Sequence, residues 1–197
     1  MANFSPRELY GGLIRAALPE NYIDASDLRQ IPDHQGVFLS PKTLTSLIFE
    51  INEYVSTTTD AAAVDFHFKD VIAEPDHVYG NLSGPTQVTM AAASLNQYPA
   101  YICEGSITSP EVDKNASSAL PLEWQQDPQT NDYYTKVYQL VVRLVKYETD
   151  LCVRINVPLR EMQSQEEATA EEDFAKVMME KIVATFDVVN FGLFHAA

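Results

Sequence analysis

The chain lacks the sequence features of a membrane protein, of a secreted protein and of a nucleotide-binding protein. No apolar run reaches the ~18–20 residues that a membrane-spanning helix needs. The N-terminal segment Met1–Glu8 has no apolar signal-peptide core. No P-loop sequence occurs, so we do not expect the chain to bind nucleotide phosphates by itself. These absences predict a soluble, intracellular protein.

Cysteine is scarce. The chain has 2 cysteines, Cys103 and Cys152, and each sits inside an apolar, strand-like run. Two free buried thiols are the interpretation favoured for a reducing compartment, and a disulfide between them is the alternative. A cysteine nucleophile needs a polar, electropositive setting, and neither run supplies one.

Residues that bind metals or act as nucleophiles are also poorly placed for chemistry. The 4 histidines are scattered, and none pairs with another ligand at a spacing such as H-x-x-x-H. The segment Gly80–Gly84 has the wrong glycine spacing for the G-x-S-x-G elbow of a serine hydrolase. We therefore expect no metal, no cofactor and no catalytic residues.

Basic residues are few, and this limits the classes of partner that the chain is expected to bind. The chain has 28 acidic against 13 basic residues, which gives a formal net charge of -15. A phosphate backbone repels such a surface, so nucleic acid is excluded as a favoured partner. A basic protein surface is the natural complement, with attraction acting mainly on the association rate. With 197 residues and 46% hydrophobic residues, the chain is long and apolar enough for one domain spanning 1–197.

Hydrophobic periodicity predicts both strands and helices. Period-two alternation over 138–144 and 151–157, around a short polar turn, indicates a β-hairpin. Strands are also expected at 9–18, 37–39, 87–94 and 99–107, helices from Asp60 to about Ile72 and over 169–186, and a polar loop insert at about 113–132. Hairpin strands with intervening helices predict an α+β fold, in which helices cover a mainly antiparallel sheet of about six strands.

A further helix is predicted after the Ser40-Pro41 pair. Leu44, Leu47, Ile48, Ile51 and Val55 recur at helical spacing. Residues three apart share one helix face, so Glu50 and Glu53 would lie together on the exposed side. From periodicity alone, that side is simply a solvated helix face.

The most specific pattern in the chain lies between positions 9 and 38. It reads Leu9-Tyr10-Gly11-Gly12, then Ile23-Asp24-Ala25-Ser26-Asp27-Leu28-Arg29-Gln30-Ile31-Pro32-Asp33-His34-Gln35-Gly36-Val37-Phe38. This pattern resembles the opening of the Ran guanine-nucleotide release factor family, and the segments 66–71, 147–151 and 155–159 are also similar to that family. The resemblance implies an antiparallel sheet with helices on both faces, like the fold of photosystem extrinsic subunits.

The resemblance also implies which residues bind the partner. In that family the helix after the opening carries two acidic residues that contribute to the Ran-binding surface, and Glu50 and Glu53 match them. The region of the opening also takes part, which adds Asp24, Asp27, Arg29 and Asp33 as candidates, although capping and local pairing would explain Asp24 equally well. Two departures, Gly36 and Lys69, each remove negative charge where the family commonly has an acidic residue.

The function implied by the resemblance is that of a binding protein. We expect the chain to bind the GTPase Ran, to promote release of its guanine nucleotide without covalent chemistry of its own, and to support nuclear import from the nucleus and the cytoplasm. A monomer is expected, with a further Ran-binding protein as an additional partner left open. The alternative is a non-catalytic structural or adaptor domain of the same fold that has no GTPase partner, and that group does not share the opening pattern.

Overall fold

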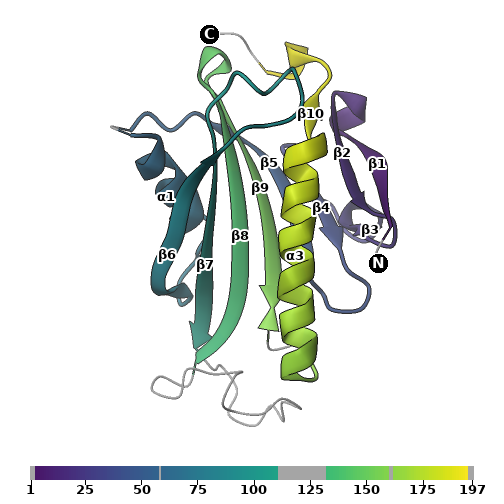
Figure 1. Cartoon of the computed structure of the whole chain (residues 1–197), viewed down its shortest axis with the longest axis vertical. Coiled ribbons are helices and arrows are strands. Elements are labelled where there is room, and N and C mark those ends of the chain that lie inside the picture. The colour runs from purple at the N-terminus through teal and green to yellow at the C-terminus, as the bar shows by residue number, and fades with distance from the viewer. Residues whose placement is uncertain (1–2, 58, 111–131, 160–161, 195–197) are drawn as a thin grey trace.

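The described residues form two antiparallel sheets and two α-helices (Figure 1). The computed structural model describes residues 3–57, 59–110, 132–159 and 162–194. The larger sheet has the strand order β3-β4-β5-β9-β8-β7-β6, and the smaller one has the order β1-β2-β10. In chain order the elements are β1 (Phe4–Leu9), β2 (Ile14–Pro19), β3 (Ile23–Asp24), β4 (Gln35–Leu39), β5 (Ser46–Glu53), α1 (Asp60–Asp70), β6 (His77–Val88), β7 (Ala100–Pro110), β8 (Asp132–Leu144), β9 (Thr149–Pro158), α3 (Gln165–Thr185) and β10 (Asp187–Val188).

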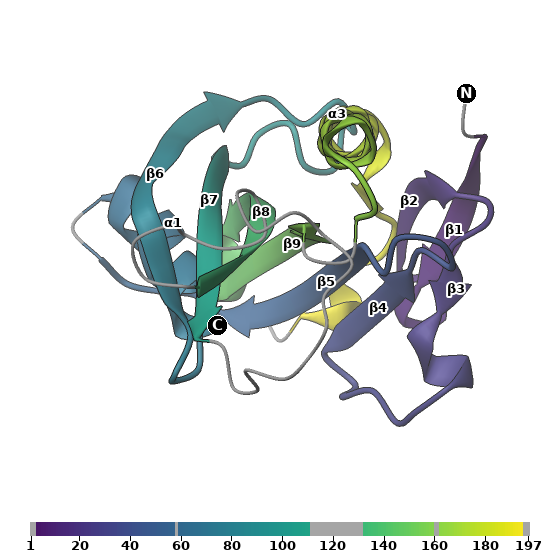
Figure 2. The same ribbon diagram turned by 90° about the horizontal axis from the view of Figure 1, so that it is seen from below.

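The predicted hairpin forms the centre of the large sheet and fixes which helix covers which face. β8 and β9 pair from Leu144↔Thr149 to Thr135↔Pro158. Because successive strand residues point to opposite faces, Leu140 joins the apolar cluster that contains α3, and Val141 joins the one that contains α1. The expected α+β fold with helices on both faces is therefore confirmed, and Figure 2 shows α1 and α3 well apart around the sheet.

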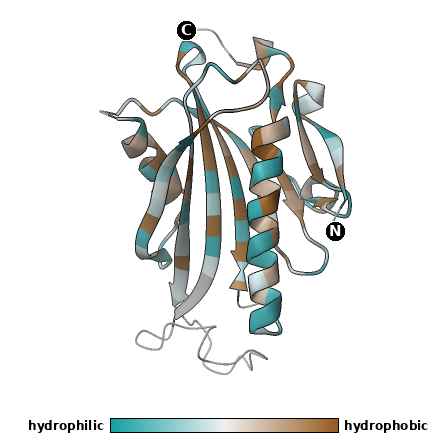
Figure 3. Ribbon diagram, viewed as in Figure 1, coloured by the Kyte–Doolittle hydropathy of each residue, from teal (hydrophilic) through white to brown (hydrophobic). Residues whose placement is uncertain are grey.

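α3 covers the face on which most of the core lies. Ser164 caps its start, with its side chain accepting a hydrogen bond from the Glu167 amide at 3.1 Å. Met178 and Ile182 are fully buried against the sheet, whereas the adjacent Val177 is half exposed. Figure 3 shows α3 in alternating hydrophilic and hydrophobic bands, as expected for a helix with one buried side.

The helix predicted over 40–55 is wrong, because this segment holds strand β5 in the interior of the large sheet, between β4 and β9. Leu47 and Phe49 are buried at period two. Apolar residues at 47, 48 and 51 fit a helical pattern, and those at 47, 49 and 51 fit a strand pattern. Leu44 adopts a left-handed φ of 58°, which ends the turn before the strand. Pairing with two neighbouring strands decides the ambiguity, since it gives the backbone of β5 hydrogen-bond partners on both edges.

The other differences concern boundaries and strand number. The strand expected at 9–18 is instead the β1–β2 hairpin, which turns at Tyr10–Gly12, where all three residues have positive φ. The strand expected at 87–94 ends at Val88. The large sheet has seven strands, close to the six expected, and a second sheet of three strands brings the described residues to ten. The polar insert expected at about 113–132 lies outside the described residues, except that Asp132 begins β8.

Candidate protein-binding site

The two parts of the opening pattern meet in space. The Tyr10 hydroxyl donates hydrogen bonds to the His34 carbonyl at 3.1 Å and to the Phe49 carbonyl at 3.0 Å. Burial raises the pKa of Tyr10, so this hydroxyl remains a donor at physiological pH. Tyr10 therefore ties the turn of the first hairpin to the segment before β4 and to β5.

The candidates from the opening pattern lie between β3 and β4 (Figure 2). Asp24 caps the 3₁₀ turn Ala25–Asp27, and its Oδ1 accepts a hydrogen bond from the Ser26 amide at 2.8 Å. Asp27 and Arg29 are exposed. Asp33 is exposed within a turn that the Gln35 amide closes onto the Pro32 carbonyl at 2.9 Å, and it shares a pocket of about 330 Å³ with Asp24.

Glu50 and Glu53 do not share a surface. Both are on β5, and residues three apart on a strand point to opposite faces. Glu53 is exposed at the end of the strand. Glu50 is only 8% exposed, accepts a hydrogen bond from Gln35 Nε2 at 2.7 Å and forms an ion pair with Arg154. The expectation of two carboxylates on one exposed helix face is therefore wrong.

The sheet register nevertheless brings Glu53 close to Asp33. Gln35 lies opposite Glu50, and the Ile51 amide donates to the His34 carbonyl at 3.0 Å. The turn that carries Asp33 consequently lies alongside the last residues of β5. Two candidates that are twenty residues apart in sequence thus come to one edge of the molecule.

A pocket of about 290 Å³ separates the end of β5 from α1 and adds residues that the sequence patterns did not single out for binding. Glu53 lines it together with Phe66 and Asp70 of α1, both of which are exposed. Phe66 is 46% exposed, so it offers an apolar contact in a pocket that acidic residues also line. Lys69 pairs with Asp65 at 2.7 Å, so its positive charge is matched locally.

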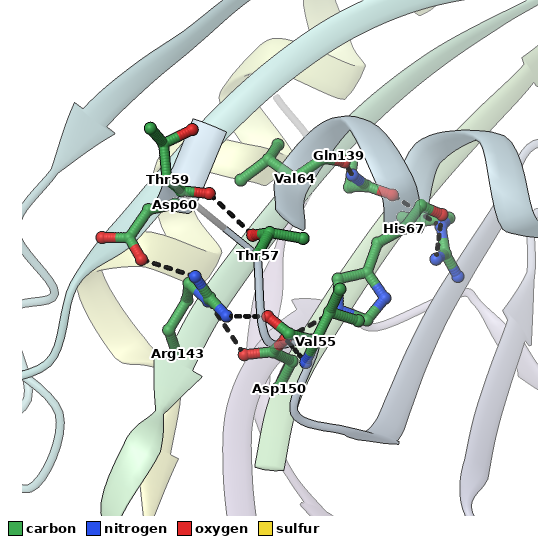
Figure 4. A network of polar contacts seen from close by, with 10 residues as sticks. Val55, Thr57, Thr59, Asp60, Val64, His67, Gln139, Arg143 and Asp150 are labelled. Atoms are coloured by element: carbon green, nitrogen blue, oxygen red, sulfur yellow. Dashed lines mark hydrogen bonds and ion pairs between the residues drawn. The ribbon is translucent and has the colours of Figure 1, made fainter. Parts of the chain in front are cut away.

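α1 rests on a buried polar layer rather than on apolar contacts alone (Figure 4). Asp150 is fully buried, and its Oδ2 accepts hydrogen bonds from His67 Nε2 at 2.8 Å and from the Val55 amide at 3.0 Å. Its Oδ1 accepts from Arg143 Nε at 3.2 Å. Arg143 also pairs with Asp60 in the first turn of α1. Both ends of α1 are thus held to the β8–β9 hairpin by polar side-chain contacts, at Asp60 through Arg143 and at His67 through Asp150.

The two buried arginines of this layer have different surroundings. Burial by itself would lower the pKa of Arg143, but the Asp150 and Asp60 carboxylates outweigh it and raise that pKa. Burial lowers the pKa of Arg154 to about 10, so its guanidinium is still charged at neutral pH. A charged and buried guanidinium needs a counter-ion, and Glu50 provides it for Arg154.

The described residues offer little for covalent chemistry. Cys103 and Cys152 are both free and buried, and burial raises the pKa of each thiol to about 12. Across the described ranges, no group of three or more histidine, cysteine, aspartate or glutamate side chains could hold a metal ion. Within the same ranges, no helix is long and apolar enough to span a membrane. What the structure offers instead is a surface suited to a protein partner.

Comparison with known proteins identifies a family for the chain. Residues 7–158 match the family described as Ran-interacting Mog1 protein. The chain is 33% identical to the Ran guanine nucleotide release factor of Bos taurus over 158 residues (79% of this chain and 77% of the relative). It is 26% identical to the nuclear import protein MOG1 of Saccharomyces cerevisiae over 202 residues (95% and 83%). The crystal structure of the S. cerevisiae Ran-binding protein Mog1p is 21% identical, covers 99% of this chain and 100% of its own, and has a TM-score of 0.64, which shows a common fold.

Proposed function

This chain belongs to the Ran-interacting Mog1 family, and we propose that it binds the small GTPase Ran and promotes release of its guanine nucleotide in support of nuclear import. The family match over residues 7–158 carries this proposal. It covers every candidate residue, including the opening pattern and β5. A role in import would take the protein between nucleus and cytoplasm, which imaging of a tagged chain can test.

The contact surface that we propose extends from the turn before β4 to α1. Its members are exposed: Asp33 in the turn, Glu53 at the end of β5, and Phe66 and Asp70 beyond the shared pocket. Asp27 and Arg29, also exposed, would extend this surface, whereas Asp24 is occupied as a cap. Exposed carboxylates around one aromatic side chain suit a basic patch that carries an apolar contact.

The proposed mechanism needs no covalent step. A protein that binds nucleotide-free Ran more tightly than loaded Ran lowers the affinity of Ran for nucleotide by the same ratio. A coupling of about 3 kcal/mol corresponds to a change of roughly 150-fold. The exposed carboxylates would contribute by competing for the lysine or the magnesium ion that holds the phosphates on the GTPase.

Release of a labelled nucleotide from purified Ran tests this proposal. We expect the chain to accelerate release at a rate that saturates with its own concentration, because release occurs from a complex. Glu53→Lys should weaken both binding and release, whereas Glu180→Lys, an exposed reversal on α3, should change neither. Both substitutions change the net charge equally, so a difference between them reports on position.

Two results would overturn the proposal. Absence of any binding to Ran, with or without magnesium and nucleotide, would favour the structural or adaptor domain without a GTPase partner. Binding whose affinity is indifferent to nucleotide would leave a Ran-binding adaptor and exclude a release factor, because linkage is reciprocal.

A further inference from the structure

Glu50 lies at the centre of a chain of contacts that joins both halves of the proposed surface. On one side it accepts a hydrogen bond from Gln35, directly after the turn that carries Asp33. On the other side it pairs with Arg154 of β9. Glu50 thus connects the start of β4 with Arg154 in the interior of the sheet.

Arg154 extends this series of contacts to α1. Its Nη2 donates to the His67 carbonyl at 2.9 Å, and its Nε donates to Gln139 Oε1 at 2.9 Å. Gln139 in turn donates to the Val64 carbonyl at 3.0 Å, one turn earlier in α1. A planar guanidinium can hold three such partners in fixed directions, so Arg154 fixes the height and rotation of α1 over the sheet.

We infer that Glu50 and Arg154 act as a positioning pair: Glu50 orients Arg154, which places α1, and thereby Phe66 and Asp70, relative to Glu53 and Asp33. This inference rests on the proposed function, and it assigns Glu50 a role other than contact with Ran. The burial of both side chains supports it, since Glu50 is 8% and Arg154 3% exposed. A partner would find little of either residue to bind.

The competing explanation is direct contact through the neighbouring pocket. Glu50 and Arg154 both line a pocket of about 300 Å³, which a side chain of the partner could enter. The two explanations predict different Ran affinities when Glu50 and Arg154 are both replaced. A positioning residue that acts only through Arg154 has no further effect once Arg154 is replaced, whereas a contact residue keeps its effect.

A double-mutant cycle on Ran affinity separates them. We expect Glu50→Gln and Arg154→Gln each to weaken the binding of nucleotide-free Ran about tenfold, and the double variant to be within about twofold of Arg154→Gln. In Glu50→Gln, the α1 amides should also exchange hydrogen faster. Additive losses, or wild-type affinity in either single variant, would overturn the positioning role.

Two controls distinguish unfolding of the protein from displacement of α1. Leu140→Ala opens a cavity on the α3 face and should lower stability without changing Ran affinity, all affinities being measured where circular dichroism shows folded protein. If Arg154→Gln does not fold, Arg154→Lys provides the same cycle, because lysine keeps the charge beside Glu50 but cannot hold the three partners of Arg154. Wild-type protein that fails to bind Ran refutes the proposed function, whereas additivity with intact wild-type binding refutes this inference alone.

Discussion

Replacement of Asp150 should be among the most destabilising single changes in the chain. Its carboxylate is fully buried and holds Arg143, His67 and the Val55 amide at once. In Asp150→Asn, the remaining oxygen is best placed at the Oδ2 position, where it meets two donors. The new amide nitrogen then faces the Arg143 guanidinium, donor against donor. Removing one member of a buried ion pair costs about 3–5 kcal/mol, and Arg143 keeps only Asp60 as a carboxylate partner.

Urea unfolding followed by circular dichroism measures this loss against a matched control. Asp173→Asn removes the same charge from an exposed pair with Lys176, whose side chains are 67% and 51% exposed. Such surface pairs contribute about 0–1 kcal/mol. A typical domain has only about 5–15 kcal/mol of stability, so Asp150→Asn should shift the midpoint clearly and the control very little. Equal losses of under about 1 kcal/mol in both variants would refute the view that a charged layer holds α1.

Three further outcomes are expected. Leu47→Ala should cost about 2–5 kcal/mol in urea unfolding because Leu47 is fully buried, whereas Leu44→Ala, at a half-exposed side chain, should stay within about 0.5 kcal/mol. The association rate with Ran should fall as salt rises, since exposed charges are screened over ~10 Å at 0.1 M, and a rate indifferent to salt would remove electrostatic steering. Cys103 and Cys152 should resist thiol reagents at pH 8 until urea unfolds the chain, because burial raises both pKa values to about 12; rapid labelling of the native protein would contradict the burial. Because these thiol pKa values are higher in the folded than in the unfolded state, their contribution to the stability of the folded state is fully present below about pH 9 and should decline as pH rises from there toward 12.

The hairpin and α3 could be predicted from sequence because their patterns allow one period only. Alternation over β8 and β9 extends across both strands and a short turn, so neither a helix nor a shifted register fits. α3 has a long 3.6-residue period, although it begins at Gln165, after the cap Ser164, rather than at the expected position 169. In both cases local preference and tertiary packing agree, which makes prediction from one sequence dependable.

β5 could not be predicted in the same way because its own residues allow two periods. Apolar side chains at 47, 48 and 51 suit a helix face, and those at 47, 49 and 51 suit a strand face. Only the partners β4 and β9 decide between them, and both lie elsewhere in the sequence. The wrong helix prediction also made the predicted site wrong, because residues three apart, such as Glu50 and Glu53, lie together on a helix but on opposite faces of a strand.

The residue that decides the role of Glu50 lies in β9 rather than in β5. Alternation places Arg154 on the face of β9 opposite to Val153 and Ile155, together with Asp150 and Cys152. The structure buries all three of these residues, so the charged Arg154 requires a carboxylate nearby. On the neighbouring strand, Ile48 is directly opposite Arg154, and Glu50 lies two residues further along the same face. Diagonal neighbours at this offset are within reach of a long side chain. Glu50 is therefore paired with Arg154 in the interior, and Glu53 is the residue of the two that remains exposed to a binding partner.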